Sequence, residues 1–175
     1  MTVLILGLLT GIVVDIGNRM QVVPIAEGFT LDSAKYQMTG SISDLTGGLA
    51  QLMTERGYYY RTSSELEEVR KMKEKLCYVA QDFDLEMQRP SMAIEAPYTV
   101  NGKTITLGSE RFRCPEALFN PSLVGKDIPT IQEIVTKSIM KCPVDHRKEI
   151  YGNIVLAGGS TCFPGMHKFL KILTK

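Results

Sequence analysis

The 175-residue sequence has no tryptophan, only two histidines and no excess of charge of either sign. Its 20 Lys and Arg residues balance 19 Asp and Glu residues, so the formal net charge is +1. Proteins that bind nucleic acids or membrane surfaces through charge usually carry a strongly basic field. We therefore expect no nucleic-acid partner.

The four cysteines are widely spaced and form neither a C-x-x-C pair nor a Cys/His cluster. They are Cys77, Cys114, Cys142 and Cys162. This spacing excludes the usual structural zinc sites. It favours free and mostly buried thiols in a reducing compartment, which predicts a cytoplasmic protein.

A long hydrophobic run is also missing. Residues 1–14 are apolar, but Gly7 and Gly11 interrupt them and no basic segment precedes them. A membrane-spanning helix needs about 20 apolar residues, and a signal peptide needs a basic start and a small-residue cleavage site. We interpret this stretch as buried strands and expect no membrane insertion.

Helical and extended patterns alternate along the chain, which predicts an α/β or mixed α+β fold. The pattern over 90–97 is typical of a loop, and Asn101-Gly102 favours a tight hairpin turn. The predicted strands cover 2–6, 11–14, 20–25, 98–107 (as a hairpin) and 153–157. The predicted helices cover 43–56, 65–80 and 165–173, with one more beginning at Pro129.

Two helix starts are predicted from particular residues. Ser64 and Glu67 have the spacing of a capping box before the helix over 65–80. Pro129 is placed at the first position of its helix, where a missing N–H costs nothing.

The first candidate site lies at the end of the strand over 11–14. There Asp15-Ile16-Gly17 can turn backbone N–H groups toward a phosphate, and Asp15 can order a metal-bound water. The alternative interpretation is an ordinary hairpin turn.

The second candidate site is Gly158-Gly159-Ser160-Thr161, which follows a strand and precedes a predicted helix. Such a turn can bind an anion or a nucleotide. It is neither a G-x-G-x-x-G fingerprint nor a P-loop. The alternative is a tight connection in which Ser160 or Thr161 caps the helix.

The third candidate is the charged helix face formed by Arg70, Lys73 and Glu74. Their spacing places them together, where they can line the base and ribose of a nucleotide or simply face solvent. His146 and His167 stand near no Ser or Cys nucleophile motif, so no catalytic constellation is predicted.

Several longer stretches resemble one known family. KEKLCYVA at 73–80, ERFRCPE at 110–116 and SIMKC at 138–142 are similar to actin almost word for word, and GGST at 158–161 resembles a turn in the second half of actin. The resemblance keeps its order over essentially the whole chain. It identifies the sequence as a member of the actin and actin-related protein family.

The resemblance covers only the half of actin called subdomains 3 and 4. It implies an α/β, actin-like fold with a ribonuclease-H-like core and an inserted α+β subdomain. The core would comprise residues 1–40 and 124–175, and the insertion residues 41–123. The family's first phosphate loop and its water-positioning glutamine have no counterpart in these residues, so no hydrolysis is expected.

The resemblance also implies a nucleotide-binding wall. Its residues would be Asp15, Gly17, Asn18, Arg70, Lys73, Glu74, Gly158, Gly159, Ser160 and Phe163. Asn18 and Arg19 replace a carboxylate and a glycine of the family's second phosphate loop, so this wall is degenerate. ATP or ADP with Mg²⁺, or no cofactor at all, remain alternatives, and no catalytic or metal-ligating residue is assigned.

Segments 25–29, 123–126 and 144–148 resemble surfaces through which actin subunits contact neighbours. The resemblance therefore implies a reduced, actin-like structural protein of the cytoskeleton that packs with protein partners into a larger assembly. Two alternatives stay open. The chain is an ATP- or ADP-binding subunit whose partner completes the cleft, or it is a fragment of a longer actin relative.

Overall fold

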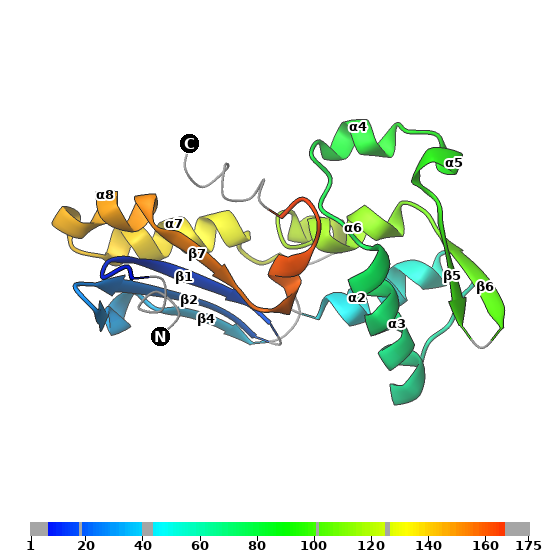
Figure 1. Cartoon of the computed structure of the whole chain (residues 1–175), viewed down its shortest axis with the longest axis horizontal. Helices are drawn as coiled ribbons and strands as arrows, with labels where there is room; N and C mark the ends of the chain where they lie inside the picture. Colours follow the sequence, from blue (N-terminus) through cyan, green and yellow to red (C-terminus); the bar gives the residue numbers. More distant parts are fainter. Residues whose placement is uncertain (1–6, 18, 40–43, 101, 125–126, 167–175) are drawn as a thin grey trace. The chain divides into compact units, whose positions relative to one another are not determined.

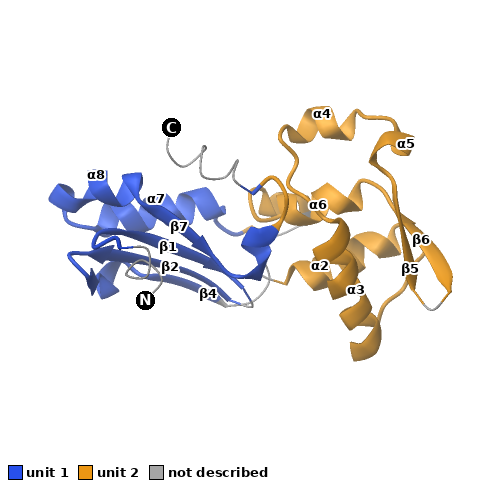
Figure 2. Ribbon diagram, viewed as in Figure 1, with its two compact units in different colours: residues 1–43, 128–162, 166–175 blue, residues 44–127, 163–165 orange. Residues whose placement is uncertain are grey.

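The computed structural model describes residues 7–17, 19–39, 44–100, 102–124 and 127–166. The chain forms two compact units (Figure 2). Unit 1 comprises Met1–Ser43, Ile128–Cys162 and Met166–Lys175, and unit 2 comprises Asp44–Asp127 and Phe163–Gly165. Their identification with two actin subdomains stays a prediction.

Unit 1 is built on a mixed five-stranded sheet. Its order is β3-β2-β1-β7, with β4 also paired to β2. β1 runs antiparallel to β2 and parallel to β7. The strands are β1 Gly11–Ile16, β2 Arg19–Ala26, β3 Phe29–Thr30, β4 Tyr36–Thr39 and β7 Ile154–Ala157.

Helices cover one face of this sheet (Figure 1). α7 (Ile131–Lys141) and α8 (Val144–Gly152) both contact the β1–β2 pair. The side chains of Ile12, Val14 and Ile16 alternate along β1 and are fully buried, as the period of two in a strand requires. Strands and helices thus share one core, and the predicted combination of both in an α/β fold is confirmed.

Unit 2 contains most of the helices and a separate hairpin of β5 and β6. α2 packs against both α3 and α6. The elements are α2 Leu45–Thr54, α3 Ser63–Leu76, α4 Phe83–Met87, α5 Ser91–Ile94, β5 Ala96–Val100, β6 Lys103–Leu107 and α6 Glu110–Glu116. Short 3₁₀ turns are η1 Asp32–Ala34 and η3 Gly159–Cys162 in unit 1, and η2 Pro121–Val124 in unit 2.

The start of α3 differs from the prediction. The capping box is formed by Thr62 and Glu65, which hydrogen-bond each other's backbone N–H groups at 3.3 and 2.8 Å. The predicted pair of Ser64 and Glu67 is wrong because the Glu67 carboxylate accepts a hydrogen bond from Arg70 at 2.9 Å instead.

The end of α3 also differs, because the helix stops at Leu76 rather than at residue 80. The backbone N–H of Tyr78 donates to the Arg111 carbonyl at 3.1 Å, and that of Val79 donates to the Pro164 carbonyl at 2.8 Å. Tertiary hydrogen bonds therefore replace the last helical turn that the apolar periodicity predicted.

Two further corrections concern prolines. The loop predicted over 90–97 contains α5 and the first residues of β5, because Ile94 is drawn into an apolar cluster with Phe112. α7 begins at Ile131 with Thr130 as its N-cap, so Pro129 lies before the helix. The predicted strand over 2–6 and nearly all of the helix over 165–173 lie outside the described residues.

Candidate functional site

In unit 1, two of the predicted segments follow neighbouring parallel strands. Asp15 pairs with Ala157 in the register of β1 and β7, so Gly17 and Gly158 both follow strand ends at the same edge of the sheet. This edge is where open α/β sheets usually bind ligands. The first and second candidate sites are thus adjacent within one unit.

Gly158 fits against the end of β1 with no room for a side chain. Its φ is +90°, and a Cβ there would collide with the Asp15 carboxylate and lie 2.6 Å from the backbone carbonyl of Ile16. Only glycine combines this backbone conformation with such a close approach. The turn after β7 therefore lies directly on the turn after β1.

The hydroxyl groups of the second turn are used locally. The Thr161 hydroxyl donates to the Gly158 carbonyl at 2.7 Å, and the Thr161 N–H donates to the same oxygen at 3.1 Å. Ser160 is buried, whereas Gly159 is exposed. The turn is therefore fixed by its own hydrogen bonds, and its exposed backbone belongs to Gly158 and Gly159.

Asp15 and Arg19 supply the charge at this edge. Asp15 is half-buried, and no described residue donates a hydrogen bond to its carboxylate. Arg19 is exposed. Asp15 pairs with Gln21 across the two strands, and residues two apart on a strand lie on the same face of the sheet. Arg19, two residues before Gln21, therefore lies on the same face as Asp15, in the diagonal position. Asn18 lies outside the described residues.

This edge suits a phosphate better than it suits a metal bound by protein alone. Arg19 offers donors to an anion, and Asp15 offers one carboxylate to a hydrated Mg²⁺. The Gly17 N–H is already used, because it donates to the Arg19 carbonyl at 3.2 Å in the turn between β1 and β2. Within the described ranges, no three His, Cys, Asp or Glu side chains gather as a metal site. A Mg²⁺ ion here would therefore depend on water and phosphate oxygens for most of its ligands.

The remaining predicted residues lie in unit 2. Arg70 is held between two carboxylates of its own helix, with Nε 2.9 Å from Glu67 and one terminal nitrogen 2.6 Å from Glu74. The two carboxylates, Glu67 first, raise the pKa of Arg70 above its usual range. This arrangement gives weight to the solvated-surface interpretation, because a ligand would have to compete with both ion pairs.

Lys73 and Phe163 have structural contacts in unit 2. The Lys73 ammonium donates to the Thr46 hydroxyl at 3.1 Å and thereby joins α3 to α2. Phe163 is buried. The assignment of all ten predicted residues to one nucleotide stays a prediction.

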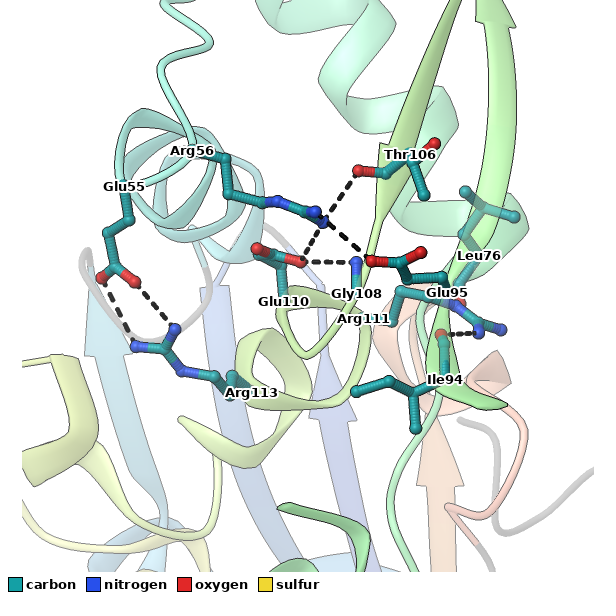
Figure 3. A network of polar contacts seen from close by, with 10 residues as sticks. All are labelled: Glu55, Arg56, Leu76, Ile94, Glu95, Thr106, Gly108, Glu110, Arg111 and Arg113. Carbon is teal, nitrogen blue, oxygen red and sulfur yellow. Dashed lines mark hydrogen bonds and ion pairs between the residues drawn. The ribbon is translucent and has the colours of Figure 1, made fainter. Parts of the chain in front are cut away.

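A polar network that sequence reasoning did not predict lies in unit 2 (Figure 3). The Arg56 guanidinium donates to the Thr106 carbonyl at 2.9 Å and lies 3.5 Å from Glu95 and 3.7 Å from the buried Glu110. Glu110 also accepts the Gly108 N–H at 2.6 Å. The network ties α2 and α6 to the hairpin, so its role is structural.

The network continues through Arg111, which no local pattern would reveal. It donates to the carbonyls of Leu76 at 3.0 Å and Ile94 at 2.6 Å, and its guanidinium lies 4.9 Å from the centre of the Tyr78 ring. Its partners are backbone groups far away in sequence. Only the fold brings them together.

The cysteines are free, and three of the four are buried, as predicted. Hydrogen bonding to Cys77 and burial raise the pKa of the Cys114 thiol, and the Cys114 Sγ lies 3.2 Å from the Leu45 carbonyl. A buried thiol with a raised pKa is a packing group, and this describes Cys114. Within the described residues, no helix is long and apolar enough to cross a membrane.

Comparison with known families places this geometry in context. The family model described as Actin matches residues 2–171 of the 175-residue chain. The match therefore covers the sheet of unit 1, all of unit 2 and both glycine turns at the edge of the sheet.

Proposed function

The chain belongs to the actin family, and from this premise we propose that it is an actin-like structural subunit that packs into a larger cytoskeletal assembly. We assign its 175 residues to the half of actin called subdomains 3 and 4. Its partners are proteins of the actin family or of the cytoskeleton. Its place of action is the cytoplasm.

Exposed apolar side chains at one end of unit 1 carry this proposal. At this end β1 begins and β2 turns into β3, and the Gly28 N–H donates to the Leu9 carbonyl at 2.7 Å. Leu9 is 63% exposed and Phe29 is 77% exposed. An exposed group of large apolar side chains is a common mark of a protein interface.

α8 adds to the same end (Figure 1). Asn153, which follows α8, accepts the Ile12 N–H at 2.9 Å and donates from its side chain to the Thr10 carbonyl at 2.9 Å. The first residue of α8, Val144, is 71% exposed. We call Leu9 and Phe29 the apolar end of unit 1.

The turn from β2 to β3 is a two-residue hairpin loop, Glu27-Gly28, in which both residues have a positive φ, as a type I′ turn requires. Glu27 has a φ of +52°, a conformation that residues other than glycine adopt at a cost of about 1 kcal/mol or more. Its N–H donates to the Thr10 hydroxyl at 3.2 Å. This turn presents Phe29 outward rather than folding it onto the sheet.

We further propose that the nucleotide wall is degenerate and that these residues alone hydrolyse no ATP. Arg19 stands at the strand edge where the family has glycine, and Arg70 is occupied by Glu67 and Glu74. Phosphoryl transfer needs phosphate clamps and a positioned water. Among the described residues, only the edge formed by the ends of β1 and β7 is available as a phosphate clamp.

A second candidate function is the binding of ATP or ADP without hydrolysis. The contact of Gly158 with Asp15 favours it, because this close approach keeps a backbone cradle at the strand ends. Titration calorimetry with Mg-ATP and Mg-ADP tests it. Heat of binding that Asp15→Ala abolishes would support it, and the absence of heat would leave the structural role alone.

Native mass spectrometry of the chain isolated with its partners tests the structural proposal. We expect a mass well above the 19.5 kDa of the single chain, and we expect Phe29→Ser to shift the population toward that single chain. Lys103→Ser, at an exposed position of the hairpin in unit 2, is the control. A single chain in every sample, or equal assembly by both variants, would contradict the proposal.

A further inference from the structure

Unit 2 contains two buried thiols that contact each other. Cys77 is the C-cap of α3, and Cys114 lies in α6. Both are buried, and their side chains hydrogen-bond to each other. Neither thiol has a part in the structural role proposed above. We call Cys77 and Cys114 the thiol pair.

Hydrogen bonds on both sides of Cys77 hold the thiol pair in place. The Arg111 side chain donates to the Leu76 carbonyl at 3.0 Å, and the Tyr78 N–H donates to the Arg111 carbonyl at 3.1 Å. Arg111 precedes Cys114 by about one helical turn, so the two lie on the same side of α6. The end of α3 is therefore fastened to α6 at the position where the two sulfur atoms meet.

The hydrogen-bond acceptors assign the protons of the thiol pair. The Cys114 thiol donates to the Leu45 carbonyl at 3.2 Å. A thiol has a single proton, so in the contact between the two sulfurs Cys77 is the donor and Cys114 is the acceptor. The Cys77 S–H group thus points at the sulfur with which it can form a bond, and a disulfide needs the two sulfurs to approach to about 2 Å.

We propose that the thiol pair is a redox site at which hydrogen peroxide joins Cys77 and Cys114 in a disulfide bond. The Cys77 thiolate attacks one oxygen of the peroxide, which forms a sulfenic acid and releases hydroxide. This hydroxide takes up the proton that Cys77 lost. The Cys114 sulfur then attacks the sulfenic sulfur, and the second hydroxide leaves as water with the Cys114 proton. Two thiols lose two electrons in total, and one peroxide becomes two waters.

Burial makes this reaction slow and selective. A buried thiol reacts only when the structure around it opens locally, and hydrogen peroxide is small enough to use a brief opening. Because Cys114 is in contact with Cys77, it is the thiol that resolves the sulfenic acid. The free thiols are then the resting state, which a reducing compartment maintains. This inference is independent of the proposed assembly.

Peptide mapping of the oxidised full chain tests the proposal. The chain is treated with hydrogen peroxide in native buffer, alkylated and digested with trypsin without a reductant. Lys or Arg residues separate each cysteine from the next, so every possible link gives its own pair of peptides. We expect the Cys77–Cys114 link to exceed every other link within the chain by at least about tenfold, a preference that only native geometry explains.

Oxidation of the chain in concentrated urea is the comparison. In an unfolded chain, short loops close more readily than long ones. The two cysteines closest in sequence are Cys142 and Cys162. Their link should therefore be favoured in urea over the Cys77–Cys114 link by about two- to threefold. A change of the main product between urea and native buffer separates native geometry from chance pairing.

Variants locate the reaction. Cys77→Ala and Cys114→Ala should each abolish the main product. Cys162→Ser, which removes an exposed thiol, is the control and should retain the Cys77–Cys114 link. The mapping of the unaltered chain is decisive by itself if either alanine variant fails to fold.

The disulfide should also stabilise the chain, because it encloses α4, α5 and the hairpin of β5 and β6 in a covalent loop. We expect the urea midpoint of the oxidised chain to rise by about 1 M. Dithiothreitol should reverse this rise, because it reduces the disulfide but leaves any methionine sulfoxide in place.

Three results would overturn the proposal. The first is a native product in which several links occur equally. The second is the absence of the Cys77–Cys114 link after peroxide has consumed the Cys162 thiol, which shows that the oxidant was active. The third is a urea midpoint that does not rise when the link has formed.

Discussion

Gly158 is the residue at which backbone conformation and close packing coincide. Replacement by alanine places a methyl group against Asp15 and Ile16 at a φ of +90°. We expect Gly158→Ala to lower the free energy of unfolding by about 2 to 3 kcal/mol. Urea denaturation measures this loss.

Gly159 provides the matched control for this substitution. A Cβ at Gly159 meets no atom within 4 Å, and its φ is not in the left-handed region. We expect Gly159→Ala to change the free energy of unfolding by less than about 1 kcal/mol. Equal losses in the two variants would refute the packing of Gly158 against β1.

The phenol of Tyr78 should titrate unusually late. Burial and the hydrogen bond to Glu86 raise its pKa to about 12. A raised pKa means that the folded protein favours the neutral phenol, so this stabilisation is complete below about pH 10 and is lost as the pH rises toward 12.

Absorbance at about 295 nm follows this titration, because the ionised phenol absorbs there more strongly than the neutral phenol. The pH at which half of the signal has appeared gives the pKa. Wild-type protein should show a component near pH 12 that Tyr78→Phe removes. Tyr59→Phe, at an exposed ring, should retain it. A titration unchanged by Tyr78→Phe would show that another residue is responsible.

For single residues, the sequence predicted the place of a side chain in the fold better than the groups to which it hydrogen-bonds. Asp15, Gly17 and Gly158 were chosen from local patterns, and the register of β1 and β7 brings them to one edge. The capture of Arg70 by Glu67 and Glu74 was not predicted. Local spacing alone allows a charged helix face either to bind a ligand or to pair with itself.

The capping box of α3 can be tested at the scale of the element. Thr62 accepts the Glu65 N–H through its side chain, so Thr62→Ala should cost about 1 kcal/mol of stability. Ser64→Ala removes the hydroxyl that the sequence pattern favoured and should cost less than about half as much. Urea denaturation of both variants decides which residue caps the helix.

Elements with strong local signals were predicted well, and those that depend on distant residues were not. The hairpin of β5 and β6 and the strand β7 follow their sequence patterns. None of the predicted helices covers α6, which contains Pro115 within its seven residues. Proline cannot donate to the Arg111 carbonyl one turn earlier, and the Tyr78 N–H from another segment takes that place at 3.1 Å.

The molecule as a whole should lose stability in acid. Hydrogen bonds lower the carboxyl pKa values of Glu55 (from Arg113), Glu65 (from the backbone of Thr62) and Glu67 (from Arg70). A lowered folded-state pKa contributes stability that is present above the unfolded value near pH 4.3 and is lost as the pH falls through the folded value.

The urea concentration at the midpoint of denaturation should therefore decrease as the pH is lowered from 5 to about 3. Glu55 and Arg113 link α2 to α6 at 2.8 Å across unit 2, so Glu55→Gln should make this fall shallower. The comparison variant is Glu68→Gln, because Glu68 pairs with Lys71 within the single helix α3, whereas Glu55 joins two helices. Because these groups are exposed, high salt should also reduce the effect. A midpoint independent of pH over this range would contradict it.

The pairing of β1 with β7 has a consequence for the order of folding during synthesis. Ile12 pairs with Ile154, and Asp44–Asp127, the main part of unit 2, lies between them in the chain. The ribosome must therefore release every residue from Ile12 to Ile154 before this strand edge closes, whereas most residues of unit 2 are available earlier. Pairing between such distant segments folds slowly. The nascent chain thus carries an open β1 edge until β7 has been made, and an unpaired strand edge of this kind is prone to aggregation.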